Sequence, residues 1–344
     1  MTHPVRTPVV AADGGLVRFA LADLLGGSAT SMRIELADAG AAEPWLTRLV
    51  GAETSLIALE QGHADVPARP ELAALALLLW ARHWWPASPS LGIPSLDPAL
   101  LDLEAAVATA AVEDVAEGLL DDFEATPAEL FDAAIAGGAL AGPAEEVRAL
   151  CARLAAWFDA QDDVVRAETA AAVQVTPGQR AYALAAGSGP ATHGEGVLAE
   201  GRASVDWARV PPGVLDAAEG TVTWRIVAAA AAARLEVEVT GAFADAALDA
   251  VATHDGEPFA EVALHLGAGR FAGSADLDAA AARLAASPSV HIGLVVGVAT
   301  DGVTGTTPED RAAVVALVRA REALPPEART LAERAAAGSA AEEF

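Results

Sequence analysis

The tripeptide Thr176-Pro177-Gly178 separates two kinds of sequence pattern. Before it, apolar residues recur every three or four positions, which is the spacing of one helix face. After it, they alternate with polar residues, as in Leu235-Glu236-Val237-Glu238-Val239, which is typical of a half-exposed antiparallel strand. The pattern therefore predicts an α+β protein, with a helical N-terminal domain followed by an antiparallel β-sandwich-like domain and C-terminal helices.

Proline and capping residues mark the expected helix starts, because the first helical position needs no backbone N–H. Thr126-Pro127-Ala128-Glu129 fits a capping box. We expect helices at residues 71–85, 98–119, 144–173 and 306–323. The third helix would bury a stripe that includes Cys151, Gln161 and Val164.

The alternating part predicts short strands with turn residues between them, as in a sandwich or a partly open barrel. The expected strands are residues 180–186, 196–207, 221–227, 234–239, 259–266, 271–277 and 290–298. The predicted domains are a helical domain at 1–175, a β-rich domain at 176–300, and C-terminal helices with an acidic tail at 301–344.

Composition excludes several classes of chemistry. All 21 basic side chains are Arg, and the chain contains neither Lys nor Asn. Both missing residues use AT-rich codons, which indicates a very GC-rich bacterial genome, such as that of an actinobacterium. The lack of Lys excludes the phosphate-binding Walker loop, a pyridoxal Schiff base and lysine-base catalysis. Cys151 is the single cysteine, which excludes an intrachain disulfide and a zinc site built on cysteines.

The formal net charge of −27 is the strongest constraint on partners. Nucleic-acid phosphates and anionic lipid heads are bound by clustered basic side chains, so we expect no direct nucleic-acid binding and no membrane binding. The segment Met1–Ala12 lacks the apolar core of a signal peptide. The most apolar run, Leu72–Trp80, is far shorter than the ~20 residues that span a bilayer. These features predict a cytoplasmic protein.

One loose set of residues is compatible with a metal. His193-Gly194-Glu195, followed by His265 (or His254) and Arg270, has the order of the two-histidine, one-carboxylate iron site of 2-oxoglutarate oxygenases. In such enzymes the arginine holds the 2-oxoglutarate carboxylate. Seven histidines and many acids produce such a set by chance, however, and the alternative is a pair of solvated histidines. The leading expectation is no metal and no cofactor.

A stretch of the chain whose charged side chains are all acidic is the candidate interaction surface. Between Trp84 and Val147 the chain has acidic residues but no Arg. A concentrated negative field attracts basic partners. The acidic residues that fall on or near one expected helix and its exit are Asp102, Glu113, Asp114, Glu117, Asp121, Asp122 and Glu124. Of these, the candidate partner-binding residues are Glu113, Asp114, Glu117, Asp121 and Asp122. The alternative is a surface that only confers solubility.

Trp84 and Trp85 are adjacent at the end of an expected helix, so both cannot face the same core. One exposed Trp would anchor a partner, and the alternative is that neighbouring elements cover both. The missing catalytic signatures and the acidic helical surface predict a non-enzymatic accessory component of a multi-protein bacterial system, which binds a partner protein with a basic surface. Two alternatives stay open: the oxygenase built on His193, Glu195 and His265, and an acidic mimic of nucleic acid.

Overall fold

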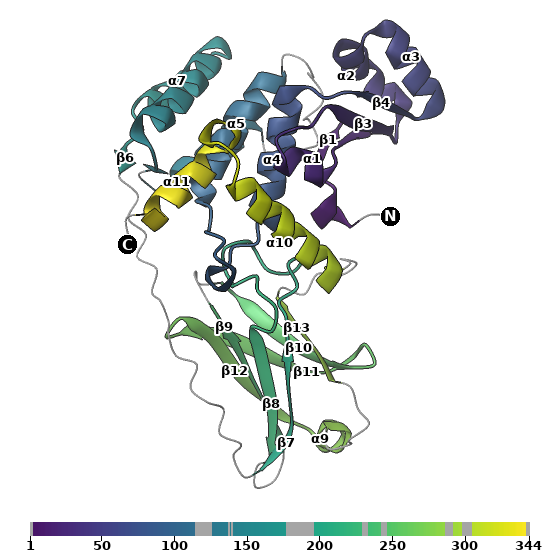
Figure 1. Ribbon diagram of the computed structural model, residues 1–344, viewed down its shortest axis with the longest axis vertical. Helices are drawn as coiled ribbons and strands as arrows, with labels where there is room; N and C mark the ends of the chain where they lie inside the picture. The colour runs from purple at the N-terminus through teal and green to yellow at the C-terminus, as the bar shows by residue number, and fades with distance from the viewer. Residues whose placement is uncertain are drawn as a thin grey trace. The chain divides into compact units, whose positions relative to one another are not determined.

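The structure, a computed structural model, forms two compact units (Figure 1). It describes residues 3–113, 126–136, 138, 140–176, 196–228, 233–241, 246–285, 292–297 and 305–341. Unit 1 comprises Met1–Trp85, Leu96–Arg180 and Pro308–Phe344, and unit 2 comprises Pro86–Ser95 and Ala181–Thr307. The described residues form α-helices and mainly antiparallel strands, so a mixed α and β fold is confirmed.

Each unit is built from segments that are separated in the sequence. The chain leaves unit 1 after Trp85, contributes ten residues to unit 2, and returns at Leu96. It leaves unit 1 again before Ala181 and returns at Pro308, so the C-terminal helices belong to unit 1. The predicted domains 1–175, 176–300 and 301–344 are segments expected to fold independently. The division into two units does not test independent folding, so these domains stay a prediction.

Unit 1 contains a four-stranded antiparallel sheet that the sequence pattern did not predict. Its strands, in the order β1-β2-β3-β4, are β1 (Val9–Ala12), β2 (Gly15–Arg18), β3 (Ser31–Leu36) and β4 (His63–Pro67). The expected order of helices first and strands afterwards is therefore wrong in this part of the chain. The strands have only four to six residues, and helices interrupt them, so their alternation is too brief to stand out.

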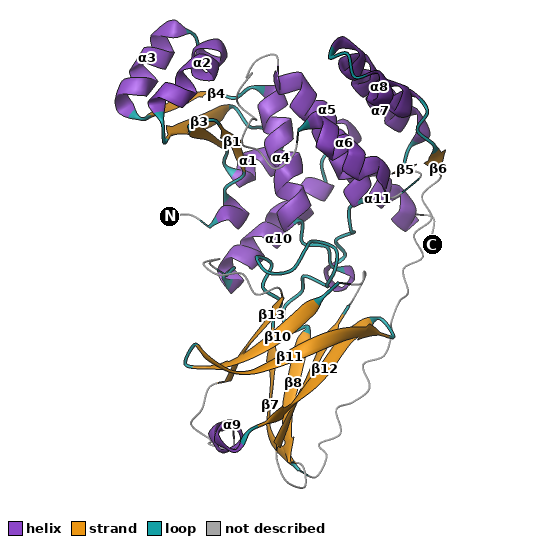
Figure 2. Cartoon of the chain, turned by 180° about the vertical axis from the view of Figure 1, so that it is seen from behind, coloured by secondary structure: helices purple, strands orange, loops and turns teal. Residues whose placement is uncertain are grey.

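Helices connect and cover this sheet (Figure 2). Trp45, Leu46 and Leu49 of α2 share one core with Val17 and Ile34 of the sheet. The helices of unit 1 are α1 (Leu21–Leu25), α2 (Ala39–Val50), α3 (Ala52–Gln61), α4 (Pro70–Trp84), α5 (Pro98–Glu113), α6 (Pro127–Ala136), α7 (Ala144–Ala160), α8 (Val164–Ala171), α10 (Pro308–Glu322) and α11 (Leu331–Ala341). In the described part of the chain, none of the helices has the length and apolarity needed to cross a bilayer.

Local capping explains where several helices begin. The Thr126 hydroxyl accepts from the Glu129 N–H at 3.2 Å, while the Glu129 carboxylate accepts from the Thr126 N–H at 2.9 Å. This confirms the capping box at the start of α6. The Asp97 carboxylate accepts from the Ala99 N–H at 2.9 Å at the start of α5. The helices expected at 71–85 and 306–323 are confirmed as α4 and α10.

The single helix expected at 144–173 is wrong. Two helices, α7 and α8, replace it, because Asp162 adopts a left-handed conformation with φ of 60° and Asp163 caps a new helix through the Arg166 N–H. The expected inward stripe therefore ends early. Cys151 is buried as expected, whereas Val164 is 57 % exposed.

Unit 2 is built on a seven-stranded antiparallel sheet. Its strands are β7 (Val197–Ala203), β8 (Val222–Ala228), β9 (Ala233–Thr240), β10 (Leu248–His254), β11 (Glu257–Gly267), β12 (Arg270–Leu277) and β13 (Ile292–Gly297), in the order β13-β10-β11-β12-β9-β8-β7. Six of them were expected, β10 was missed, and the strand predicted at 180–186 lies outside the described residues. A short helix, α9 (Ala279–Ala285), follows β12. The parallel pair β5 (Leu140–Ala141) and β6 (Val175–Thr176) belongs to unit 1.

The seven-stranded sheet curls toward a barrel, which is the second of the two arrangements expected from the sequence, a sandwich or a partly open barrel. Strand β11 forms the corner, because residues 257–264 pair with β10 and residues 265–267 pair with β12. Gly273 permits this bend, since a Cβ there would collide with the Ala263 carbonyl oxygen. The edge strands β7 and β13 come close to one another, and the concave side holds an aliphatic core around Leu235, Val237 and Phe271.

Candidate functional site

The acidic surface predicted from the sequence lies largely outside the described residues. Glu113 is the last described residue of α5 and is partly buried. Asp114, Glu117, Asp121 and Asp122 follow it and are not described. Their role in partner binding stays a prediction.

Several other acids of the same stretch hold unit 1 together. Asp102 is buried on α5 against the Arg82 guanidinium of α4. Asp132 of α6 accepts three hydrogen bonds from Arg166 near the start of α8, the shortest at 2.7 Å. Glu146 of α7 lies 3.3 Å from the Arg334 guanidinium of α11. Arginines from elsewhere in the chain thus reach this Arg-free stretch, and part of its charge is used in folding.

The two tryptophans at the end of α4 differ in their surroundings. Trp85 is buried. Trp84 is partly exposed, and its ring meets the His3 ring edge-on at a centroid distance of 5.7 Å. Binding of a partner by either ring stays a prediction.

The loose metal set is not assembled from described residues. His193 and Glu195 lie outside them. His265 is exposed on β11, and Arg270 of β12 points its guanidinium at Glu238 of β9, 3.0 Å away. Among the described residues, no three His, Cys, Asp or Glu side chains are grouped as metal ligands would be.

We expect the purified protein to carry no stoichiometric iron or zinc, because a set this loose arises by chance in a chain with seven histidines. Elemental analysis of the full chain measures this directly. Near one equivalent of iron that is lost in Glu195→Ala and retained in the control Glu200→Ala would contradict the expectation and favour the oxygenase.

The most highly charged buried region joins the C-terminal helices to the rest of unit 1. Arg321 of α10 is 2 % exposed, and its guanidinium donates to both carboxylate oxygens of Glu333 on α11, at 2.7 and 2.9 Å. It also donates to the backbone carbonyl of Leu25 at the end of α1, at 3.1 Å, and to that of Ala328 at 3.0 Å. One side chain thereby connects α1, α10 and α11.

A second carboxylate reaches α11 from α5. Glu104 accepts the backbone N–H groups of Leu331 at 2.7 Å and Ala332 at 2.9 Å, at the positive end of the helix. Burial raises the pKa of Glu104 from 4.5 to about 7, with a further contribution from Glu333, although both N–H bonds and Arg334 favour the charged form. Desolvation exceeds these opposing effects. The half-buried Glu104 thus lies close enough to the buried Glu333 to feel its charge, and Glu333 is the carboxylate that pairs with the buried Arg321.

Helix α3 carries one of two pairs of adjacent, exposed apolar side chains among the described residues. Its buried residues are the small Ser55 and Ala58, and Leu59 is partly buried against the same core, whereas Leu56 and Ile57 are 67 % and 50 % exposed. A helix on a core normally buries most of its large apolar side chains. Here only Leu59 of the three large ones faces inward, and the Ser55 hydroxyl lies 3.0 Å from the Thr47 hydroxyl of α2. The apolar pair is left on the outside.

Helix α8 carries a second exposed pair, Val164 and Val165, at 57 % and 75 %. Arg166 fixes the start of this helix by donating to Asp163 at 2.6 Å as well as to Asp132. The Arg166 hydrogen bonds lower the pKa of Asp163. This pair therefore stands on a fixed support, next to an arginine and two carboxylates.

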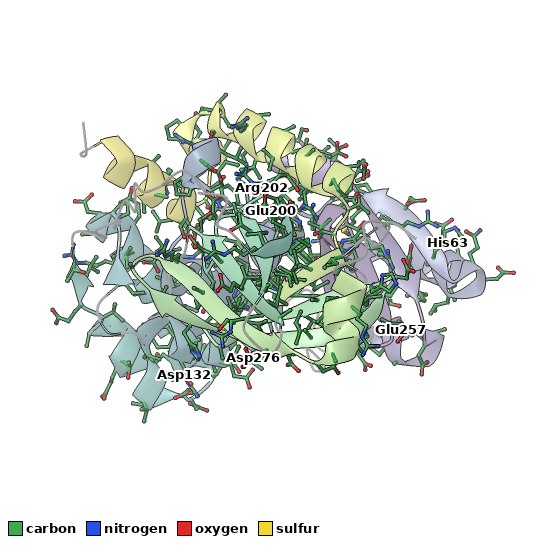
Figure 3. The ribbon with its side chains drawn as sticks, turned by 90° about the horizontal axis from the view of Figure 1, so that it is seen from below. His63, Asp132, Glu200, Arg202, Glu257 and Asp276 are labelled. Atoms are coloured by element: carbon green, nitrogen blue, oxygen red, sulfur yellow. The ribbon has the colours of Figure 1, made fainter. Side chains whose placement is uncertain are left out.

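The convex face of the seven-stranded sheet is charged but balanced. Arg225 of β8 donates to Glu236 of β9 at 2.6 Å, and Arg234 of β9 donates to Asp276 of β12 at 2.8 Å. Glu200 and Arg202 lie two residues apart on the edge strand β7 (Figure 3). Alternating signs across neighbouring strands stabilise a solvated face and give it no strong preference for a charged partner.

The sequence carried a signal for α3 that was not used. Glu53, Leu56, Ile57 and Glu60 follow the spacing of one helix face, and Ser55, Ala58 and Leu59 occupy the opposite side. The pattern does not say which side faces the core, and packing on α2 decides that.

No protein-family model, curated protein or solved structure matches the chain.

Proposed function

We propose that the protein is a non-enzymatic accessory component of a multi-protein system and that it binds a partner protein with a basic surface. The observation that carries the proposal is the orientation of α3, which buries Ser55 and Ala58 and exposes Leu56 and Ile57. Large apolar side chains on the surface lose water when a partner covers them, which favours association.

Charge selects the kind of partner. With a formal net charge of −27, the chain repels nucleic acid and anionic lipid and attracts basic proteins from a distance. The predicted acidic run from Glu113 to Asp122 would speed the encounter, and an apolar contact such as that on α3 would slow dissociation. Attraction and apolar burial act on different rate constants, so they can be measured separately.

We expect the acidic run to raise the association rate at low salt. Replacing Glu113 and Glu117 by Gln and Asp121 by Asn should reduce recovery of a basic partner and flatten its salt dependence, because the Debye length falls from ~10 Å at 0.1 M to ~3 Å at 1 M. Pull-down of the full chain, followed by association rates for the recovered protein at both salt concentrations, measures the effect.

The matched control removes three exposed carboxylates elsewhere, as Glu145→Gln, Glu168→Gln and Glu257→Gln. It changes the net charge equally and should keep most of the binding. Equal losses in the two triple variants would show that only total charge matters, and unchanged recovery by both would remove support for the acidic run. Competition by double-stranded DNA for the recovered protein would favour the acidic mimic of nucleic acid.

A further inference from the structure

The exposed face of α3 has a regular order of side chains. Glu53, Leu56, Ile57 and Glu60 occupy positions i, i+3, i+4 and i+7 of one helix, so they form a continuous stripe. All four are exposed. Along about two turns of the helix, the stripe therefore has a glutamate at each end and two apolar side chains between them. Helix α3 itself contains no arginine.

The stripe stands on a well-defined support. The buried Ala58 belongs to the same core as the sheet, and the buried Ser55 lies against Thr47 of α2. The helix ends at Gly62 in the left-handed conformation, with φ of 74°. Figure 1 and Figure 2 both show α3 at the periphery of unit 1, beyond the sheet. The apolar pair is therefore presented from a regular helix.

The acids at both ends of the stripe argue against a second copy of this chain as the occupant. If two α3 helices packed antiparallel, Glu53 of one copy would face Glu60 of the other. If they packed parallel, each glutamate would face its own equivalent. Like charges at such a contact are unfavourable in either orientation. A complementary helix needs Arg or Lys where α3 has Glu53 and Glu60.

We propose that the Glu53–Leu56–Ile57–Glu60 stripe of α3 is a docking site for an amphipathic helix of a partner protein, in which two apolar residues lie between basic residues spaced one heptad apart. This deepens the function proposed above and rests on it. The apolar side chains pack against Leu56 and Ile57, and the basic side chains pair with the two glutamates.

The test uses the full chain and a dye-labelled synthetic peptide of three Arg-Ala-Ala-Leu-Leu-Ala-Ala repeats, with binding followed by fluorescence anisotropy. Leu56→Ser together with Ile57→Ser should weaken binding about thirtyfold, which corresponds to about 2 kcal/mol of lost apolar burial. Glu53→Gln together with Glu60→Gln should weaken it about fivefold at about 0.05 M salt and less at about 0.5 M.

The matched control makes the same change at the other exposed pair, Val164→Ser with Val165→Ser, and should leave peptide binding within about twofold. A peptide with Glu in place of Arg should bind at least tenfold more weakly than the Arg peptide. All changes are at exposed positions, so circular dichroism should show intact folding for every variant.

Equal weakening by the α3 and α8 variants would overturn the docking site, because it would show general attraction of the peptide to apolar surface. Tight binding of the Glu peptide would overturn the charge assignment. If the peptide test overturns the α3 docking site but the wild type still recovers a basic partner in a salt-sensitive way, the proposed function stands. If the peptide test overturns the docking site and the wild type also recovers no basic partner, the proposed function is wrong as well.

Discussion

Replacing Arg321 by Met is expected to lower the free energy of unfolding of unit 1 by about 3–5 kcal/mol, because it leaves the buried Glu333 carboxylate without its counter-charge. The change also frees the Leu25 and Ala328 carbonyls that the guanidinium satisfies. Urea denaturation followed by tryptophan fluorescence measures the loss, because five of the seven tryptophans belong to unit 1.

Two further variants separate the loss of the buried counter-charge from the loss of an arginine as such. Arg319→Met, at an exposed position of the same helix, should cost less than about 0.5 kcal/mol. The double change Arg321→Met with Glu333→Leu should be less harmful than the single change, because it leaves no isolated buried charge. A single variant as mild as Arg319→Met would show that the Arg321–Glu333 pair contributes little to the stability of unit 1.

The second large effect depends on pH. Because burial raises the pKa of Glu104 from 4.5 to about 7, the folded protein holds this proton more tightly than the unfolded chain does. The stability contributed by the protonated group is complete below the unfolded value and is lost as pH rises through the folded value. Between about pH 4.5 and pH 7 this residue should reduce stability by about 3 kcal/mol as pH rises.

Comparison with Glu104→Gln isolates the effect, since glutamine resembles the neutral acid and does not titrate. The glutamine NH2 loses one of the two backbone N–H bonds, which costs a constant amount, and on top of it the stability of the variant relative to wild type should rise by up to about 3 kcal/mol from about pH 5 to about pH 8. Glu145→Gln, at an exposed position of α7, should differ from wild type by a nearly constant amount over the same range. A pH-independent difference for Glu104→Gln would show that this carboxyl is charged throughout.

Local sequence patterns predicted some of the helices and strands and missed others. Helix α4 was predicted because proline marks its start and its apolar run is long. Strand β9 was predicted because its alternation lasts for eight residues. Strand β3 also alternates, with Met32 and Ile34 inward, but six residues between two helices did not distinguish it. Length alone did not decide which elements were recognised, since β13 has six residues and was predicted, whereas β10 has seven and was missed.

The contacts that define the buried charge cluster could not be predicted. Glu104 and Leu331 are separated by 227 positions, and nothing in either local sequence indicates that they meet. The break between α7 and α8 was missed because Gln161 to Val164 continues the helical spacing, and only the left-handed Asp162 interrupts it. For α3 the stripe was readable, whereas its outward direction depends on α2.

The segmented build of unit 1 has a consequence for biosynthesis. At about 5–20 residues per second, the ribosome needs roughly 6–25 s to travel from the end of the second segment to Pro308, and all of the seven-stranded sheet is made in that interval. During this time Glu104 and the carbonyls of Leu24 and Leu25 have no α10 or α11 to bind. The nascent first unit must therefore wait, incompletely closed, for the last segment to emerge, and this interval is when chaperones and proteases have access to it.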